Sequence, residues 1–278
     1  MLAYPSYLAA SLFTEVRFEK VISRSSAICA LIASLMYLRA TGGWSLEGIG
    51  LRAPARAWPR QFALALAAGA ALILGMEVVL LTLGVHESEA GRDFGVAALA
   101  GRAGLALVAG VLIGTIEEIL FRGALYGAAQ RGMGAAAATL LTSAVYAAAH
   151  YVKYPAPPPG EAIGWFTWIG LYPTTLNWFS YRSVYDAMAA LFLLGVLLCL
   201  LRRHFGHIVA GIGLHTGIAA ALLMVKYATD HVHGAPYGFL VSRYDNYQGW
   251  LACAVLATAI AVLIVMERRG GAAAASQA

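Results

Sequence analysis

The apolar stretches of this sequence contain a few side chains that can accept, donate or relay a proton. They are Glu77, Glu117, Glu118, Arg122, Tyr146, His150 and His215. A charged side chain inside a membrane span is costly, so such a residue normally faces a protein interior or a wet cavity and has a function. A lone histidine on an apolar helix is more often a satisfied core residue than a catalyst. The spacing of these residues must therefore distinguish a functional site from a set of core residues.

The segment GTIEEILFRGALYG contains two adjacent glutamates and an arginine. Glu118 and Arg122 are four residues apart, so they share a helix face and can form an ion pair. Glu117 then points about 100° away around the helix and has no partner within this segment. A lone carboxylate in a cavity of low dielectric constant is a competent general base or acid. The alternative interpretation is a buried ion-pair lock without catalytic chemistry.

The positions of Glu117 and His150 predict that the two residues meet. Gly132 and Gly134 indicate a tight turn between two antiparallel helices. Glu117 lies 16 residues before the midpoint of this turn and His150 lies 17 residues after it. The two side chains are therefore expected at nearly the same depth on adjacent helices, and packing alone explains such a pair poorly.

The elements that would position these residues are membrane-spanning helices. Hydrophobic residues make up 60% of the 278 positions and charged residues 12%, whereas soluble proteins have about a quarter charged residues. A spanning helix needs about 20 mostly apolar residues. Seven are predicted, over 21–38, 61–84, 103–129, 133–152, 184–201, 207–227 and 248–266. We expect an all-α, polytopic transmembrane helix bundle.

This bundle is expected to form a single integral membrane domain over 1–278. Its catalytic core would occupy approximately 96–227, and the low-complexity tail at 270–278 is expected to be disordered. Basic connections at 39–60, 130–132, 202–206 and the C-terminal end alternate with mixed or acidic ones. The positive-inside rule places the basic connections in the cytoplasm, and with seven spans the N-terminus is then outside.

The connection 153–183 is rich in aromatic residues, which favour the membrane–water interface. It is interpreted as an interfacial belt or, alternatively, as a lid or substrate platform. The basic loops account for the net charge of +5, so no nucleic-acid partner is expected.

Together, the motifs resemble those of the CPBP family, which includes type II CAAX prenyl endopeptidases and bacteriocin-processing-type intramembrane proteases. The EExxxR motif, the F/YxxxH motif and the third-motif histidine occur in this order as Glu117, Glu118, Arg122, Tyr146, His150 and His215. The segment LEGIGLRAP is also similar to the family's usual post-helix segment, and the resemblance covers about 40–225.

The resemblance implies an intramembrane endopeptidase that hydrolyses a peptide bond of a membrane-associated protein or peptide. Glu117 would activate a water molecule, and His150 and His215 would position this water or stabilise the oxyanion. Glu118 and Arg122 would orient the site, and Tyr146 is assigned to substrate binding. The expected location is a multi-pass position in a bacterial-type plasma (inner) membrane. Whether the substrate is prenylated stays open.

One position departs from the family pattern. The third motif often reads HxxxN, but Ala219 stands where the asparagine would be, so one amide donor for the oxyanion is missing. A catalytically silent binding or immunity-type protein of the same fold is therefore an alternative function. A proton-coupled transporter is a weaker alternative, because buried Glu and His also build proton relays.

The mechanism also has two versions. No cofactor is expected if Glu117 acts as a glutamate base without a metal. Alternatively, Glu117, His150 and His215 would form a zinc ligand set, which one carboxylate and two imidazoles can provide. Counting residues from the turn at Gly132 predicts a site toward the middle or outer half of the bilayer.

Overall fold

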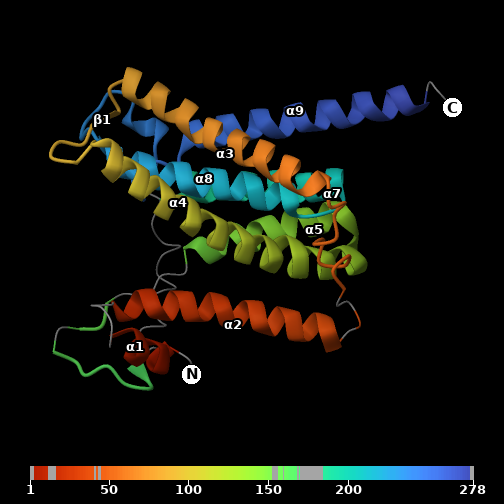
Figure 1. Ribbon diagram of the computed structural model, residues 1–278, viewed down its shortest axis with the longest axis horizontal. Coiled ribbons are helices and arrows are strands. Elements are labelled where there is room, and N and C mark those ends of the chain that lie inside the picture. Colours follow the sequence, from red (N-terminus) through yellow and green to blue (C-terminus); the bar gives the residue numbers. More distant parts are fainter. Residues whose placement is uncertain are drawn as a thin grey trace.

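Long helices make up most of the computed structural model, and five of them are long and apolar enough to cross a membrane, which confirms the all-α membrane bundle (Figure 1). The structure describes residues 3–11, 17–40, 42, 45–151, 156–158, 160–167, 169 and 184–275. The helices are α1 (Ala3–Ser11), α2 (Phe18–Ala40), α3 (Ala57–Thr82), α4 (Val96–Glu117), the π-helix η1 (Glu118–Leu125), α5 (Tyr126–His150), α7 (Tyr185–Phe205), α8 (Val209–Ala228), the short 3₁₀ helix η4 (Gly238–Leu240) and α9 (Trp250–Ala275).

Each predicted span coincides with a helix, although the described helices differ in their capacity to cross a membrane. Five of them are long and apolar enough, and the continuous segment Val96–His150 counts once among these five. In α2 the apolar helix found among the described residues is Ile28–Ala40, which is shorter than a span. The first half of α2 is more polar, with Glu19, Lys20 and Arg24 in its sequence.

The segment Val96–His150 reverses direction at Gly134. This glycine has φ 80° and ψ 168°, a conformation that side chains with a Cβ atom rarely adopt. The arms before and after Gly134 lie antiparallel, because His150 on the second arm reaches Glu117 on the first. The predicted turn between the third and fourth spans is therefore confirmed.

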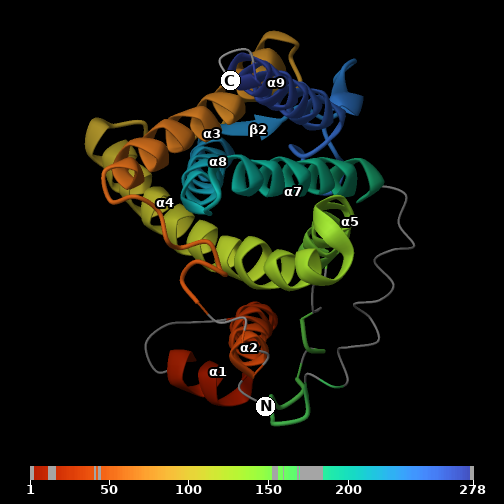
Figure 2. The same ribbon diagram turned by 90° about the vertical axis from the view of Figure 1, so that its right-hand side faces the viewer.

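Helix α8 is the central element of the bundle, enclosed by α3, α4 and α7 (Figure 2). Its glycines allow this enclosure, because backbones approach each other closely where side chains are small. Gly213 and Gly217 lie directly against backbone carbonyls of α3, and Gly110 and Gly114 of α4 lie against α8. His215, between the two α8 glycines, is thereby held in the middle of the bundle.

The basic connections gather at one end of the bundle. Arg202, after the apolar part of α7, donates hydrogen bonds to the carbonyls of Gly48 and Gly123 at 2.9 and 3.2 Å. The backbone N–H of Ile208 donates to Gly50 at 2.8 Å, and His204 lies 3.4 Å from Glu267 of α9. We call this the basic end. Its clustering agrees with the predicted alternation of loops.

The opposite end contains a small feature that the sequence did not predict. Strands β1 (His86–Ser88) and β2 (Thr229–His231) pair in antiparallel fashion, with His86 opposite His231. This two-stranded sheet joins the α3–α4 connection to the end of α8.

Two predicted segments fall partly outside the described residues. In the aromatic connection 153–183, Trp165 and Phe166 are described and exposed, whereas Tyr172 and Trp178 lie outside the described residues. Helix α9 runs to Ala275, within the stretch predicted to be a disordered tail, and 276–278 lie outside the described residues.

Candidate active site

The pair of Glu118 and Arg122 forms the buried base of the site. Arg122 Nη1 donates to Glu118 Oε1 at 3.0 Å, and both side chains are fully buried. Arg122 Nη2 also points to the carbonyl oxygen of Gly195 on α7, at 3.4 Å. The guanidinium carbon lies 4.3 Å from the centre of the Tyr146 ring, within cation–π distance. One arginine therefore connects η1 with α5 and α7.

The two glutamates lie where the helix changes its winding. Glu117 is the last residue of α4, and Glu118 is the first residue of the π-helix η1. A short π-helical stretch inside an α-helix often occurs at a functional site. Gly123 within η1 packs against the carbonyl of Ile49, and its own carbonyl accepts a hydrogen bond from Arg202. The family-like segment LEGIGLRAP thus contacts the helix that carries both glutamates.

Glu117 and the two histidines converge from three helices. Glu117 Oε2 lies 3.7 Å from His150 Nε2 of α5 and 3.6 Å from His215 Nε2 of α8. The side chains of Glu117 and His150 are 24% and 29% exposed, whereas that of His215 is 6% exposed. These separations exceed a direct hydrogen bond, and Glu117 Oε2 itself is buried without a hydrogen-bond partner among the described residues.

The second ring nitrogen of each histidine is held by a specific acceptor. His150 Nδ1 lies 2.9 Å from the carbonyl oxygen of Tyr146, which can only accept, so Nδ1 carries the hydrogen. His215 Nδ1 lies 3.4 Å from Glu118 Oε1. Both rings are therefore oriented with Nε2 toward Glu117, and the neutral form of His150 presents a lone pair there.

Two residues around the site shape it without facing solvent. Gly211 on α8 leaves room for Glu118, because a Cβ atom at this position would lie 2.5 Å from Glu118 Oε2. Tyr146 is 1% exposed, and its ring packs edge-on against His150 with 4.5 Å between ring centres. Its predicted substrate contact stays a prediction, while its position under His150 indicates a supporting role. The resemblance to the F/YxxxH motif identified Tyr146, whereas no sequence signal distinguished Gly211 from the other glycines of α8.

Helix α8 has no asparagine or glutamine that could replace the amide donor missing at position 219. Ala219 lies one turn beyond His215 and is only partly buried. No group of three or more His, Cys, Asp or Glu side chains suited to a metal ion occurs in the described part of the chain. The zinc version of the mechanism, with Glu117, His150 and His215 as ligands, therefore gains no support from the geometry and stays an untested alternative.

The site lies a few residues along two helices from contacts of the basic end. Glu117 is six residues before Gly123, whose carbonyl is bonded to Arg202. His215 is seven residues after Ile208, whose N–H is bonded to Gly50. These short separations favour a site nearer the basic end than the count from Gly132, and the depth of the site in the bilayer stays a prediction.

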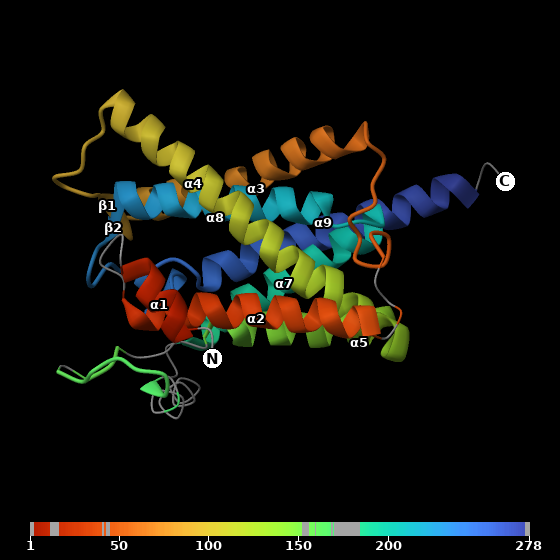
Figure 3. The ribbon, with the colours of Figure 1, turned by 60° about the horizontal axis from the view of Figure 1, so that its bottom comes forward.

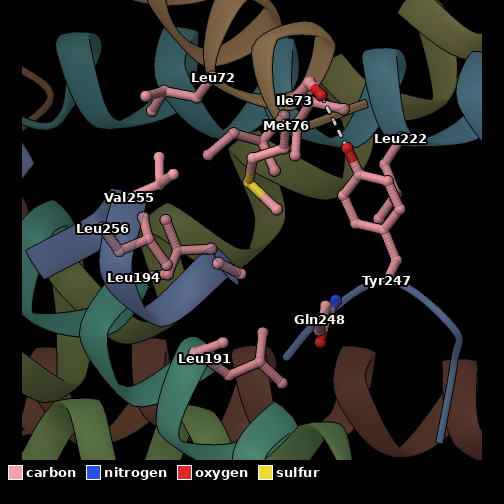
Figure 4. Close-up of a pocket in the computed structure, with 13 residues that line it drawn as sticks. Leu72, Ile73, Met76, Leu191, Leu194, Leu222, Tyr247, Gln248, Val255 and Leu256 are labelled. Atoms are coloured by element: carbon pink, nitrogen blue, oxygen red, sulfur yellow. Dashed lines mark hydrogen bonds between the residues drawn. The ribbon is translucent and has the colours of Figure 1, made fainter. Parts of the chain in front are cut away.

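An apolar cavity lies between α3, α7, α8 and α9 and does not include the site residues (Figure 4). It has a volume of about 50 Å³ and an almost entirely apolar lining that includes Leu72, Met76 and Leu194. At its rim the hydroxyl of Tyr247 donates to the carbonyl of Ile73 at 2.7 Å. Glu77, predicted to be a functional residue, is also remote from the site and pairs with His86 at 3.0 Å.

Comparison with protein families identifies a match over the central part of the chain. The family model described as type II CAAX prenyl endopeptidase Rce1-like matches residues 100–221. This range contains all six residues of the expected motifs, from Glu117 to His215. No curated protein and no solved structure matches the chain.

Proposed function

We propose that this chain, whose residues 100–221 match the family model of Rce1-like type II CAAX prenyl endopeptidases, is an intramembrane endopeptidase with Glu117 as its general base. The family supports intramembrane proteolysis in general, and the apolar helices make the chain an integral membrane protein. The observation behind the finer proposal is the convergence of Glu117 Oε2 with the Nε2 atoms of His150 and His215.

In this mechanism a water molecule between the three groups attacks the peptide carbonyl. Glu117 accepts a proton from the water, and the lone pair on His150 Nε2 orients it. The carbonyl of Tyr146 fixes the His150 ring, which is the supporting role that we propose for this tyrosine. The proton taken by Glu117 then passes to the amine that leaves.

The oxyanion needs a donor, because no amide stands at position 219. We assign this role to His215. Its Nδ1 faces Glu118 and its Nε2 faces Glu117. A ring with hydrogen on both nitrogens would donate from Nδ1 to Glu118, which Arg122 holds in place, and from Nε2 to the oxyanion. The substrate is a membrane-associated protein or peptide in a bacterial-type plasma membrane.

The experiment that tests this proposal is a cleavage assay with Glu117→Gln. The purified protein is reconstituted with membrane-associated candidate substrates, prenylated and unprenylated, and products are identified by mass spectrometry. Glutamine keeps the size of the side chain but cannot take the proton, so we expect the rate to fall by about 10²–10⁴-fold. Glu87→Gln is the matched control, since this carboxylate is exposed at the opposite end of the bundle.

Full activity of Glu117→Gln would exclude the glutamate-base mechanism. Loss of wild-type activity on treatment with a chelator, restored by zinc, would replace it by the zinc version. If wild type binds these substrates without cleaving any of them, the chain is the catalytically silent protein of the same fold.

A further inference from the structure

A groove at the basic end has arginines at the beginning of α3 and apolar walls further along this helix. It has a volume of about 670 Å³ and lies between the first half of α3, the end of α7 and the start of α8. Helix α9 diverges from α3 toward this end, so it leaves this side of α3 uncovered (Figures 1 and 3). The lining residues are Arg56, Arg60, Gln61, Leu64, Ala65, Ala68, Leu201, Phe205, Ala210 and Leu214.

One face of α3 changes from cationic to apolar with depth. Arg56, Arg60, Leu64 and Ala68 follow each other at intervals of four residues, so they lie on the same helix face. The two arginines are exposed at the beginning of the helix, next to Trp58, and the apolar pair lies deeper. A phospholipid presents its charged phosphate and its acyl chains in the same order and over a comparable length.

The charge of the groove is not neutralised by the protein. No described residue forms an ion pair with Arg56 or Arg60, and no acidic side chain lines the groove. Glu267 of α9 is engaged by His204 instead. The walls below the arginines are apolar, with Leu64 61% exposed and Phe205 37% exposed. A ligand with one anionic group and long apolar chains complements both parts.

We propose that this groove binds one anionic phospholipid of the surrounding leaflet, with its phosphate on Arg56 and Arg60 and an acyl chain along Leu64 and Ala68. The predicted orientation puts the basic end in the cytoplasm, where anionic lipids attract basic residues close to the membrane.

The lipid would also support the candidate active site. Ala210 and Leu214 line the groove, and their neighbours Gly211 and His215 on α8 contact Glu118. An occupied groove therefore fixes the helix that carries His215. This consequence rests on the proposed function, whereas lipid binding itself does not.

Lipid binding is measured by native mass spectrometry of the full chain released from detergent. Phosphatidylglycerol is compared with phosphatidylcholine of the same acyl chains. We expect the wild type to bind phosphatidylglycerol at least about tenfold more tightly, and the double variant Arg56→Gln/Arg60→Gln to lose this preference. Arg268→Gln/Arg269→Gln is the matched control, because it removes two exposed charges near the same end but outside the groove.

A second variant separates a groove from a merely charged surface. Ala68→Trp fills the apolar part and keeps both arginines, so it should also lose the bound lipid. Glycerol phosphate, which lacks acyl chains, should not displace the lipid. Retention of the preference in either groove variant, or its loss in the control, would overturn the proposal. Displacement of the lipid by a cleavable substrate would also overturn it, by making the groove a substrate site. The assay detects bound lipid by its mass. Its result therefore does not depend on whether the chain cleaves peptides.

Discussion

At the scale of single residues, the candidate site depends on one buried ion pair. Arg122 and Glu118 are fully buried, and Glu118 also faces His215 Nδ1 at 3.4 Å. A buried pair gains little over an apolar pair of the same volume, but removal of one partner leaves an uncompensated charge. The pair is therefore better explained by the positioning of His215 than by stability.

Either Arg122→Ala or Glu118→Ala should lower the free energy of unfolding by about 3–5 kcal/mol, because each leaves the other charge buried and unpaired. Thermal unfolding in detergent measures this loss. Arg52→Ala is the control, since Arg52 and Glu47 form an exposed pair that contributes only about 0–1 kcal/mol. A variant of Arg122 or Glu118 that melts like the wild type would show that the pair carries no such penalty.

Sequence spacing predicted the pairs that are set by helix geometry. Glu118 with Arg122, and Glu117 with His150, follow from the period of the helix and from the turn at Gly134. The ring orientations of the histidines could not be predicted, because they depend on the Tyr146 carbonyl and on Glu118 across helices. Gly211 likewise acquires its role only when α8 packs against η1.

At the scale of elements, apolar length predicted the helices well, but the π-helix η1 and the β1–β2 sheet were missed. A π-helix has no distinct residue pattern, since the tertiary contacts of Gly123 and Arg122 stabilise it. The sheet consists of two strands of three residues each, too short for an alternating pattern to be recognised. Glu77 was recognised as a buried charge, but its partner His86 lies outside every predicted span.

His86 connects three parts of the fold: β1, which contains it, α3 through Glu77, and the segment before α9 through Asn246. His86 Nδ1 lies 3.0 Å from Glu77 Oε2 on α3, and Nε2 lies 2.9 Å from the backbone carbonyl of Asn246 before α9. A carbonyl only accepts, so both nitrogens carry hydrogen when Glu77 is ionised. Burial alone would lower the pKa of His86, but Glu77, the Asn246 carbonyl and Asp230 together outweigh burial and raise it.

The stabilisation provided by the contacts of His86 should decrease as pH rises. The raised pKa of His86 means that its contribution is fully present below about pH 6.5 and is lost as pH rises through the higher pKa of the folded state. Burial and the neighbouring His86 lower the pKa of His231, so acidification below pH 6.5 removes stability through His231 instead. Melting temperatures of wild type and His86→Gln, measured between pH 6 and 9, should differ at the acidic end and converge at the alkaline end. A difference that stays constant with pH would contradict this role of His86.

At the scale of the whole molecule, the charges of the loops predicted which ends of the helices lie together. Arg202 holds Gly48 and Gly123, and His204 contacts Glu267, so the basic connections form one end. The depth of the site in the bilayer, which residue counting from Gly132 predicts, stays a prediction, because the sequence does not reveal how far the arm before Gly134 extends beyond the other helices.

The orientation of this end is the remaining prediction. In a background with the exposed Cys29 replaced by serine, single cysteines are introduced as Arg131→Cys near the basic end and Ser88→Cys in β1, both at exposed positions. The positive-inside rule predicts that a membrane-impermeant maleimide labels position 131 only in inverted vesicles and position 88 only in intact cells. The reverse pattern would place the basic end outside. Since Glu117 is only six residues before Gly123 on the same continuous helix, the predicted pattern would bring the scissile bond toward the cytoplasmic side of the bilayer. A substrate would then approach from the side on which the proposed phospholipid binds.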